Sequence, residues 1–293
     1  MNRSKIIGAT ALASVMAASA AQAEMSIGGL FAGSIDDTSA DVASTFSTNS
    51  IYVTYSDSLD NGMGVALTMS LNGTAGTTNL VTDVNIDTGM GTIGLGTGQD
   101  SAVDGMDGSP ACFSLNACGS ALNANYNDGD AASGNSIAYS NSMGGIDFKI
   151  TRGMESATTN PVMSYAAGMS IMGATVKAGV SSIDYIAPAT ADIDPSFVTV
   201  GYSIAGLNLG YAMYDGDNGG EETQMGVGTS AMGMNVGVTF ADADLATDVD
   251  YMRVSLSKGM GAASFGLDYT ETDEAGGTAN DSDHWNFMYV VGF

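Results

Sequence analysis

The sequence is organised around Gly91-Thr-Ile-Gly-Leu-Gly-Thr-Gly-Gln99, a strand-like run followed by a very long connection from residue 100 to about residue 133. Two further strand-like runs come after this connection, Asn135-Ser-Ile-Ala-Tyr-Ser140 and Ile146-Asp-Phe-Lys-Ile150. Connections longer than about 12–15 residues are uncommon in a compact domain unless they have a function. This one also holds the only two cysteines of the chain. We therefore expect it to do more than join two strands.

Outside this segment, large apolar side chains alternate with small or polar ones at every second position. Such alternation is typical of strands with one apolar face and one polar face. The strand from residue 207 is an example, because Leu207, Leu209 and Tyr211 alternate with Asn208 and Gly210. Sixteen strands are predicted, at roughly 25–35, 49–57, 63–71, 78–87, 91–99, 135–141, 145–153, 162–171, 173–184, 196–204, 206–215, 222–230, 233–241, 249–257, 261–271 and 284–293.

The connections between these strands alternate between short and long. This pattern gives seven tight turns at one end of the sheet and eight longer loops at the other. Transmembrane β-barrels have this organisation, because a sheet that crosses a bilayer must close on itself to pair every backbone group. The predicted fold is an all-β, transmembrane antiparallel β-barrel of about 16 strands. A soluble β-sandwich is the alternative, with its large apolar face turned inward.

The N-terminus has the composition of an export signal. Arg3 and Lys5 precede an uncharged run of small and apolar residues that ends in Ala21-Gln22-Ala23. This is the arrangement of a secretory signal with a small-residue cleavage site, although a membrane anchor is an alternative interpretation. We take residues 1–23 as a signal peptide and residues 24–293 as the exported domain. No other segment approaches the roughly 18 apolar residues of a membrane helix.

The charge balance excludes some partners. The chain has 32 Asp and Glu residues and only 7 Lys and Arg residues, two of which lie in the signal. A protein this acidic repels nucleic-acid phosphates, so we expect no nucleic-acid partner. It is also poorly suited to binding an anionic bilayer surface. Forty glycines, four prolines and few helix formers indicate an all-β chain rather than a disordered one.

The last predicted strand is aromatic along one face. Trp285, Phe287, Tyr289, Val291 and Phe293 share this face, and the sequence stops there. An unprotected aromatic strand at the edge of a soluble sheet would invite pairing with other chains. In a barrel, the same strand pairs with the first strand and closes the ring.

With these features, the sequence resembles the bacterial outer-membrane general porins of the sixteen-stranded Gram-negative type. The resemblance covers the whole exported domain in organisation. It is most specific at 91–99, at 135–139 together with 144–148, and at the terminal Phe293. It implies insertion into the lipid bilayer of the outer membrane, a homotrimer, and a third long loop that folds into the barrel as a constriction. It also implies that the barrel-assembly machinery recognises Phe293.

Side-chain parity assigns the charged residues of the strands to the lumen or to the lipid face. The residues predicted to lie on the pore wall are Lys149, Lys177, Arg253, Asp83, Asp147 and Asp268. The candidate constriction acids lie on the long segment and are expected to face the three cations; they are Asp100, Asp104 and Asp107. The resembling porins commonly carry an arginine just before the loop, where this chain has Thr97-Gly98-Gln99. A strong transverse field is therefore not expected.

Small and apolar residues suggest how the segment meets the wall. Gly94, Gly96 and Gly98 share the lumen face of their strand. Their bare backbone either makes room for the inserted segment or simply keeps the pore open. The side chains expected to hold the segment against the wall are Met106, Phe113, Leu115 and Leu122.

Cysteines and loop acids suggest two further sites. Cys112 and Cys118 belong to an exported chain, so we expect a disulfide between them; a metal pair is the alternative. Loop carboxylates offer oxygen ligands for weak calcium binding, and the candidates are Asp128, Asp130, Asp215 and Asp217. None of these clusters matches a complete EF-hand loop, so solvated loop acids are the alternative.

No catalytic constellation is present in the sequence. The only histidine, His284, begins the last strand, and the glycine-rich runs lie inside strands and do not open a helix. We predict a channel for passive diffusion of small hydrophilic solutes and ions, with a preference for cations because acids dominate. Two alternatives stay open: a channel specific for one substrate class, and a secreted, calcium-stabilised β-sandwich or adhesin.

Overall fold

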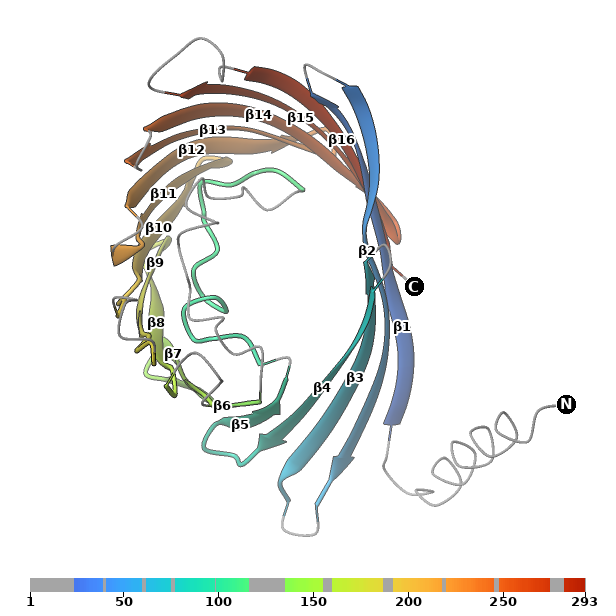
Figure 1. Ribbon diagram of the computed structural model, residues 1–293, viewed down its shortest axis with the longest axis vertical. Helices are drawn as coiled ribbons and strands as arrows, with labels where there is room; N and C mark the ends of the chain where they lie inside the picture. The colour runs from blue at the N-terminus through green and yellow to red at the C-terminus, as the bar shows by residue number, and fades with distance from the viewer. Residues whose placement is uncertain are drawn as a thin grey trace, which may run out of the picture.

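Each strand pairs with its neighbours in sequence and the last strand pairs with the first, so the sheet closes into a barrel (Figure 1). This computed structural model describes residues 24–38, 41–59, 62–74, 77–97, 99–115, 135–154, 160–186, 192–217, 220–244, 248–274 and 282–292. None of these residues belongs to a helix long and apolar enough to cross a bilayer.

All sixteen predicted strands are present, and every pairing is antiparallel. The strands are β1 Glu24–Thr38, β2 Asp41–Ser58, β3 Gly64–Thr74, β4 Thr77–Asp87, β5 Thr92–Gly96, β6 Ser136–Met143, β7 Ile146–Gly153, β8 Met163–Ile171, β9 Ala174–Ser182, β10 Ser196–Ile204, β11 Leu207–Asp215, β12 Glu221–Ala231, β13 Met234–Asp244, β14 Val249–Met260, β15 Ala263–Glu274 and β16 Ser282–Gly292.

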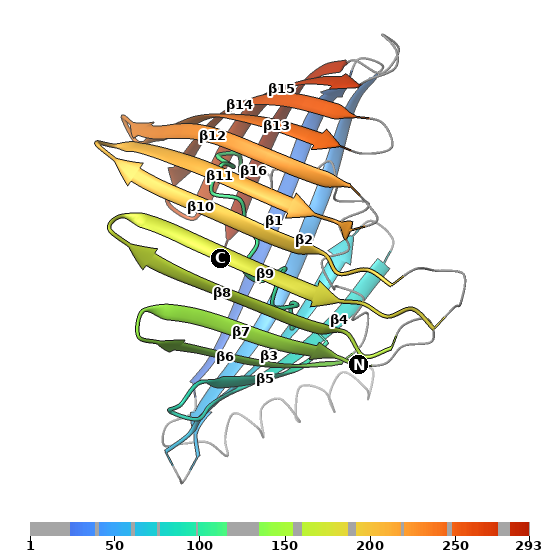
Figure 2. The ribbon, with the colours of Figure 1, turned by 90° about the vertical axis from the view of Figure 1, so that its left-hand side faces the viewer.

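Tight turns gather at one end of the barrel and longer connections at the other (Figure 2). Four of the tight turns have positive φ at both central residues, at Gly144–Gly145, Met172–Gly173, Ala205–Gly206 and Met232–Gly233. Two-residue hairpins favour this conformation because its twist matches that of the flanking strands. Glycine at the second position of each turn adopts it without steric cost.

The wall is apolar outside and polar inside. On β8, Tyr165 and Ile171 face outward and are about half exposed, whereas Ser164, next to Tyr165, is buried on the lumen side. On β10, Thr199 and Phe197 are likewise buried on the inner face. Large apolar side chains thus cover the outside of a closed sheet, as in a membrane barrel. The β-sandwich alternative is wrong.

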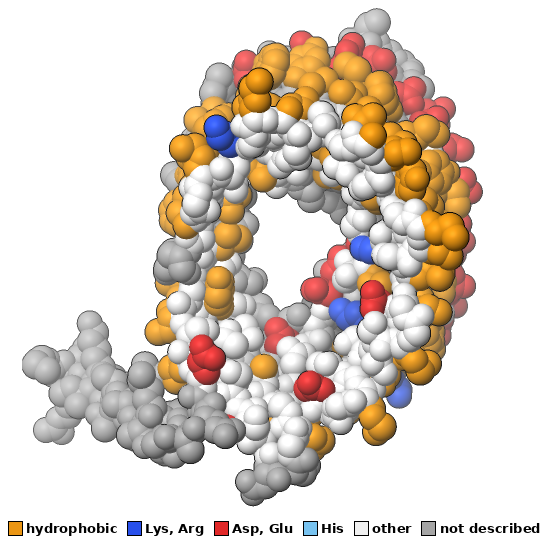
Figure 3. All heavy atoms as spheres, turned by 180° about the vertical axis from the view of Figure 1, so that it is seen from behind, with side chains coloured by type: hydrophobic (Ala, Val, Ile, Leu, Met, Phe, Trp, Pro, Cys, Tyr) orange, Lys and Arg blue, Asp and Glu red, His pale blue; other side chains and the backbone are white. Residues whose placement is uncertain are grey.

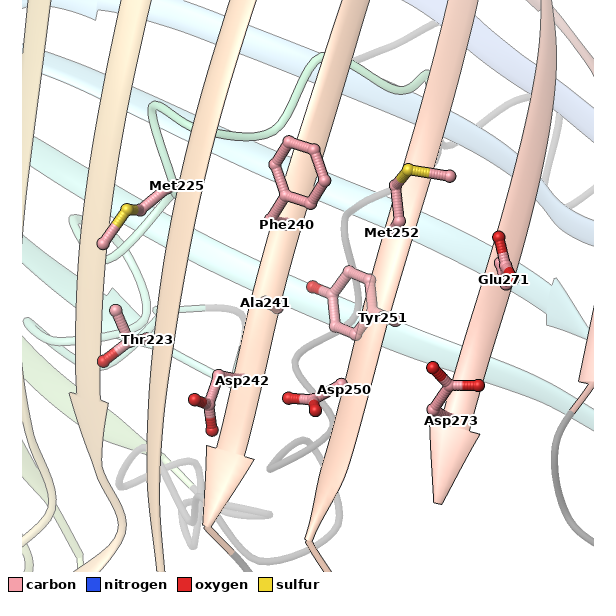
Figure 4. Close-up of a pocket in the computed structure, with 10 residues that line it drawn as sticks. All are labelled: Thr223, Met225, Phe240, Ala241, Asp242, Asp250, Tyr251, Met252, Glu271 and Asp273. Carbon is pink, nitrogen blue, oxygen red and sulfur yellow. The ribbon is translucent and has the colours of Figure 1, made fainter. Parts of the chain in front are cut away.

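The apolar outer band ends in a row of carboxylates near the long-loop end. Phe240 and Met252 are directly paired across β13 and β14, and both face outward (Figure 4). Two residues further along the strands, Asp242 pairs with Asp250, which in turn pairs with Asp273. Charges at mid-depth on a lipid face are costly, so this row marks where the wall leaves the hydrocarbon.

Several strand boundaries differ from the prediction, among them those of β1, β2 and β5. β1 continues to Thr38 and β2 already begins at Asp41, so most of the loop expected at 36–48 belongs to these two strands. The sequence of this hairpin has no regular alternation of apolar and polar residues. Its two strands nevertheless stay paired, with Ser34 opposite Thr45 beyond a bulge and Thr38 opposite Asp41 at the end. β5 ends at Gly96 instead of Gln99, because Gly96 adopts a φ of 145° and the chain turns away from the sheet.

The segment between β5 and β6, residues 97–135, is called the insert below. Its described stretch 99–115 runs through the lumen along the inner surface of the wall (Figure 1). It contacts side chains on strands from β7 to β15, which form the covered wall. The strands β1–β4 and β16 form the open wall.

Candidate pore constriction

The insert begins with a single helical turn. The amide of Gly105 donates to Ser101 O at 3.0 Å, and that of Asp107 donates to Val103 O at 2.8 Å. The Ser101 hydroxyl accepts from the Asp104 amide at 2.9 Å. A serine in this position caps the first turn by satisfying an amide that has no partner within the turn. The hydrogen bonds of this turn, and not pairing with a strand, orient Asp100, Asp104 and Asp107.

A small apolar core lies between this turn and the covered wall. Ala102 and Val103 of the insert are fully buried, and Met106 packs beside them. The wall contributes inward-facing side chains from three strands, namely Ala166 on β8, Phe197 on β10, and Ala212 and Tyr214 on β11. The predicted role of Met106 is confirmed by this packing.

Wall hydroxyls bond to the backbone of this first part of the insert. The Val103 amide donates to the Ser164 hydroxyl on β8 at 3.0 Å, and both groups are buried. The Tyr214 hydroxyl on β11 donates to Asp107 O at 2.9 Å. Each pairing satisfies a backbone group that would otherwise lack a partner inside the barrel. The path of the insert is therefore specified by side chains far away in sequence.

The second part of the insert is held in the same way. The Thr239 hydroxyl on β13 donates to Ala111 O at 2.6 Å in a buried contact. Further along, the Ser114 hydroxyl donates to the carboxylate of Asp268 on β15. Asp268 is only 3% exposed, so its carboxylate is covered by the insert. It faces the lumen side, as parity predicts, but serves as an anchor.

Carboxylates of the insert lie near ammonium groups of the wall at the start of the insert. Burial, followed by the charge of Asp104, raises the pKa of Asp100, and the ammonium of Lys149 on β7 opposes this increase. The Lys149 ammonium extends beneath the helical turn, because a Cβ placed on Gly105 would lie 2.8 Å from Lys149 Nζ. This lysine therefore lies against the insert, on the covered wall.

Asp107 is the most strongly shifted of the three acids. Burial, followed by the charge of Asp104, raises its pKa to about 7, and the charge of Lys177 on β9 opposes the increase. Lys177 packs beside Met106 over Gly168, so it too lies on the covered wall. The structure thus brings Asp100, Asp104 and Asp107 together with two of the three expected cations.

Of the other predicted wall residues, Arg253 lies apart from this cluster, whereas the charge of Asp83 contributes to the raised pKa of Asp100. Arg253 on β14 donates through Nε to Thr270 at 3.1 Å, and its guanidinium lies 5.6 Å from the centre of the Tyr251 ring. Asp83 on β4 accepts from Gln99 Nε2 at 3.4 Å where the insert leaves the wall. Asp147 on β7 is exposed, two residues before Lys149. The open wall carries no Lys or Arg residue.

The lumen stays open beside the insert. Figure 3, viewed from behind, shows a continuous opening, with acidic and basic side chains together along one side of it. The opening therefore has an uneven lining: the insert and the lysines of the covered wall lie on one side, and the open wall on the other side has no Lys or Arg residue.

The sequence of this barrel matches the family model of the Gram-negative porins over residues 8–290. The chain belongs to the Gram-negative porin family. It is a multi-pass β-barrel of the outer membrane that forms a water-filled channel for passive diffusion of small hydrophilic solutes and ions. The family is one of channels rather than enzymes.

Solved porin structures share this fold at low sequence identity. The porin is similar to a loop-deletion mutant of OmpT, an outer membrane protein of Vibrio cholerae, with a TM-score of 0.75 and 13% identity over 93% of this chain and 100% of that chain. It is also similar to a triple mutant of the Rhodopseudomonas blastica porin, with a TM-score of 0.71 and 14% identity over 92% of this chain and 100% of that chain. No curated protein matches the sequence.

Several predicted site residues lie outside the described residues: Cys118, Leu122, Asp128, Asp130, Phe293 and the signal at 1–23. The pairing of Cys112 with Cys118 therefore stays a prediction. Asp215 Oδ1 and Asp217 Oδ2 accept backbone amides of the loops at 2.8 and 3.1 Å. Among the described residues, no three His, Cys, Asp or Glu side chains are grouped to hold a metal ion. Calcium binding at Asp215 and Asp217 stays a prediction as well.

The sequence argument missed the groups that fix the insert. Ser164, Tyr214 and Thr239 face the lumen by parity, but nothing local distinguishes them from other pore-lining hydroxyls. The glycines before the insert were assigned in part. The side chain of Gln99, which belongs to the insert, folds back over Gly94, as the first of the two interpretations predicts. A Cβ on Gly96 would instead meet the backbone of β4, and Gly98 lies outside the described residues.

Proposed function

We propose that this porin prefers cations, and that Asp100, Asp104 and Asp107 set the preference at the narrowest part of the channel. The observation that carries the proposal is the position of Lys149 and Lys177 beside the insert, on the covered wall only. The lysines offset part of the acidic charge locally. They do not form a cationic surface across the opening, since the open wall has no Lys or Arg residue.

The field in such a channel attracts cations along its whole length. Charged groups at close quarters determine the selectivity of a pore, and walls of low dielectric constant focus that field on the water between them. Because positive charge is confined to one side, a permeating anion meets no continuous cationic path. A permeating cation meets acids on the insert and, near the turn end, Asp87 and Asp147, which line the same hollow as Lys149.

Reversal potentials across planar bilayers in a KCl gradient test this proposal. We expect a cation-selective potential for the native porin and a smaller one for Asp104→Asn. The matched control is Asp250→Asn, which removes the same charge from the outer face and should leave the potential unchanged. An anion-selective native channel would refute the proposal, and so would an equal response of the two variants.

The remaining proposals follow from the resemblance and from the composition. We propose removal of residues 1–23 on export, assembly as a homotrimer, recognition of Phe293 by the barrel-assembly machinery, a Cys112–Cys118 disulfide, and no enzymatic activity. Mass spectrometry of the mature protein tests the removal of residues 1–23 and the disulfide. Cross-linking in detergent tests the trimer.

A further inference from the structure

Glycines on the covered wall lie side by side beneath the insert. Gly201 on β10 pairs directly with Gly210 on β11, and Gly210 pairs with Gly226 on β12. One step further, Gly228 on β12 pairs with Gly237 on β13. We call these five residues the glycine track. It crosses four adjacent strands at lumen-facing positions.

The insert occupies the space that side chains on the track would fill. A Cβ on Gly210 would overlap the carbonyl of Pro110 and the amide of Ala111, and a Cβ on Gly226 would overlap the Ala111 carbonyl. The Phe113 side chain fills the space above Gly228 and Gly237, and both glycines are buried. Glycine permits such close approach because it has no Cβ.

We propose that the glycine track determines the pore size, because it fixes how far the insert recedes from the centre of the lumen. This inference deepens the channel function described above and rests on it. Hydrogen bonds before, on and after the track prevent the insert from sliding sideways: Tyr214 binds Asp107 O, Thr239 binds Ala111 O, and Asp268 binds Ser114. Any atom added to the track therefore moves the insert into the water-filled opening.

The same glycines would occur if small residues only kept the pore wide. In that case, they would border water, and an added methyl group would project freely into the lumen. The contacts of Pro110, Ala111 and Phe113 distinguish the two explanations, since they fill the volume above the track. The glycines thus widen the opening indirectly, by lowering the insert onto the wall.

A series of alanine substitutions tests the proposal by single-channel conductance. Restoring a carbon contact distance of about 3.5 Å moves the insert roughly 1 Å inward, so we expect Gly210→Ala and Gly226→Ala to lower conductance by about 1.2- to 1.5-fold. Gly201→Ala should have a smaller effect, because its Cβ would lie 3.1 Å from the Pro110 Cβ. The matched control is Gly259→Ala on β14, whose Cβ would lie 3.9 Å from its nearest neighbour, Ser264 Oγ.

Correct folding is checked by the migration of unheated and heated samples in detergent gels. If the alanine variants fail to fold, Phe113→Ala adds no atom to the wall, and we expect it to loosen the insert and raise conductance. Unchanged conductance in a folded Gly210→Ala, or in Phe113→Ala, overturns the proposal. If the native protein forms no channel at all, the channel function fails first; if it conducts and the series is flat, only the glycine track fails.

Discussion

The open wall and the covered wall differ in what fills the space above their lumen-facing glycines. On the open wall, the space above Gly28 of β1 is filled by the ring of Tyr52 from the neighbouring strand β2. On the covered wall, the space above Gly210 and Gly226 is filled by the backbone of the insert. The open wall is therefore complete by itself, whereas the covered wall is completed by a segment that enters from elsewhere in the chain.

This difference indicates that the barrel provides the closed wall of the channel and that the insert provides its selectivity. Ladder pairing closes the barrel on both sides, including β1 with β16. The covered wall carries the groups that bond along the insert, such as Ser164 and Thr239, whereas Asp83 and Asn85 on β4 of the open wall bond to Gln99 where the insert begins. We infer that the barrel can form without the insert, and that the pore properties depend on how the insert is seated.

The largest expected effect comes from removing the insert. Gly96 and Ser136 are paired across β5 and β6, so a short Gly-Ser turn can replace the residues between 99 and 134. Because conductance follows the open cross-section, we expect an increase of roughly two- to fourfold and passage of larger sugars in liposome swelling. A folded barrel with the conductance of the native porin would break the comparison, since the insert would then not limit the pore.

How much of this the sequence predicts depends on the range of the interactions. Alternation along a strand is local, so parity alone assigns Tyr165 of β8 to the outer face and its neighbour Ser164 to the inner face, where the structure has them. The insert has no period, and its path depends on contacts such as Thr239 with Ala111, 128 residues apart. One signal was available: Gly210 and Gly226 both occupy lumen positions of adjacent strands, although only a known register aligns them.

A smaller effect is expected from pH. Burial and Asp104 raise the pKa of Asp107 to about 7, so its charge appears as the pH rises from about 6 to 8, and the cation preference should rise by up to about twofold. Asp107→Asn should remove this step. Asp104→Asn should move it to lower pH, because the repelling neighbour is lost. A step that persists unchanged in Asp107→Asn would assign the titration to another group.

The raised pKa of Asp107 also makes the stability of the seated insert depend on pH. The folded state binds the Asp107 proton more tightly than the unfolded chain does. The stabilisation is therefore complete below the ordinary pKa of 3.8 and is lost as the pH rises through about 7. Hydrogen exchange of the insert amides should accelerate over this range, whereas amides of the open wall should change only with the intrinsic chemistry of exchange.

The smallest expected effect comes from a single hydroxyl. Thr239→Val keeps the shape of the side chain but leaves the buried Ala111 carbonyl without this donor, at a cost of about 1–3 kcal/mol to the seating of the insert. We expect noisier open-channel current and faster exchange near Ala111, with the barrel still folded. Thr229→Val is the matched control, since the Thr229 hydroxyl donates to Gly206 O in an exposed turn. If both variants behave alike, the covered wall does not fix the insert through Thr239, and its apolar contacts alone must hold it.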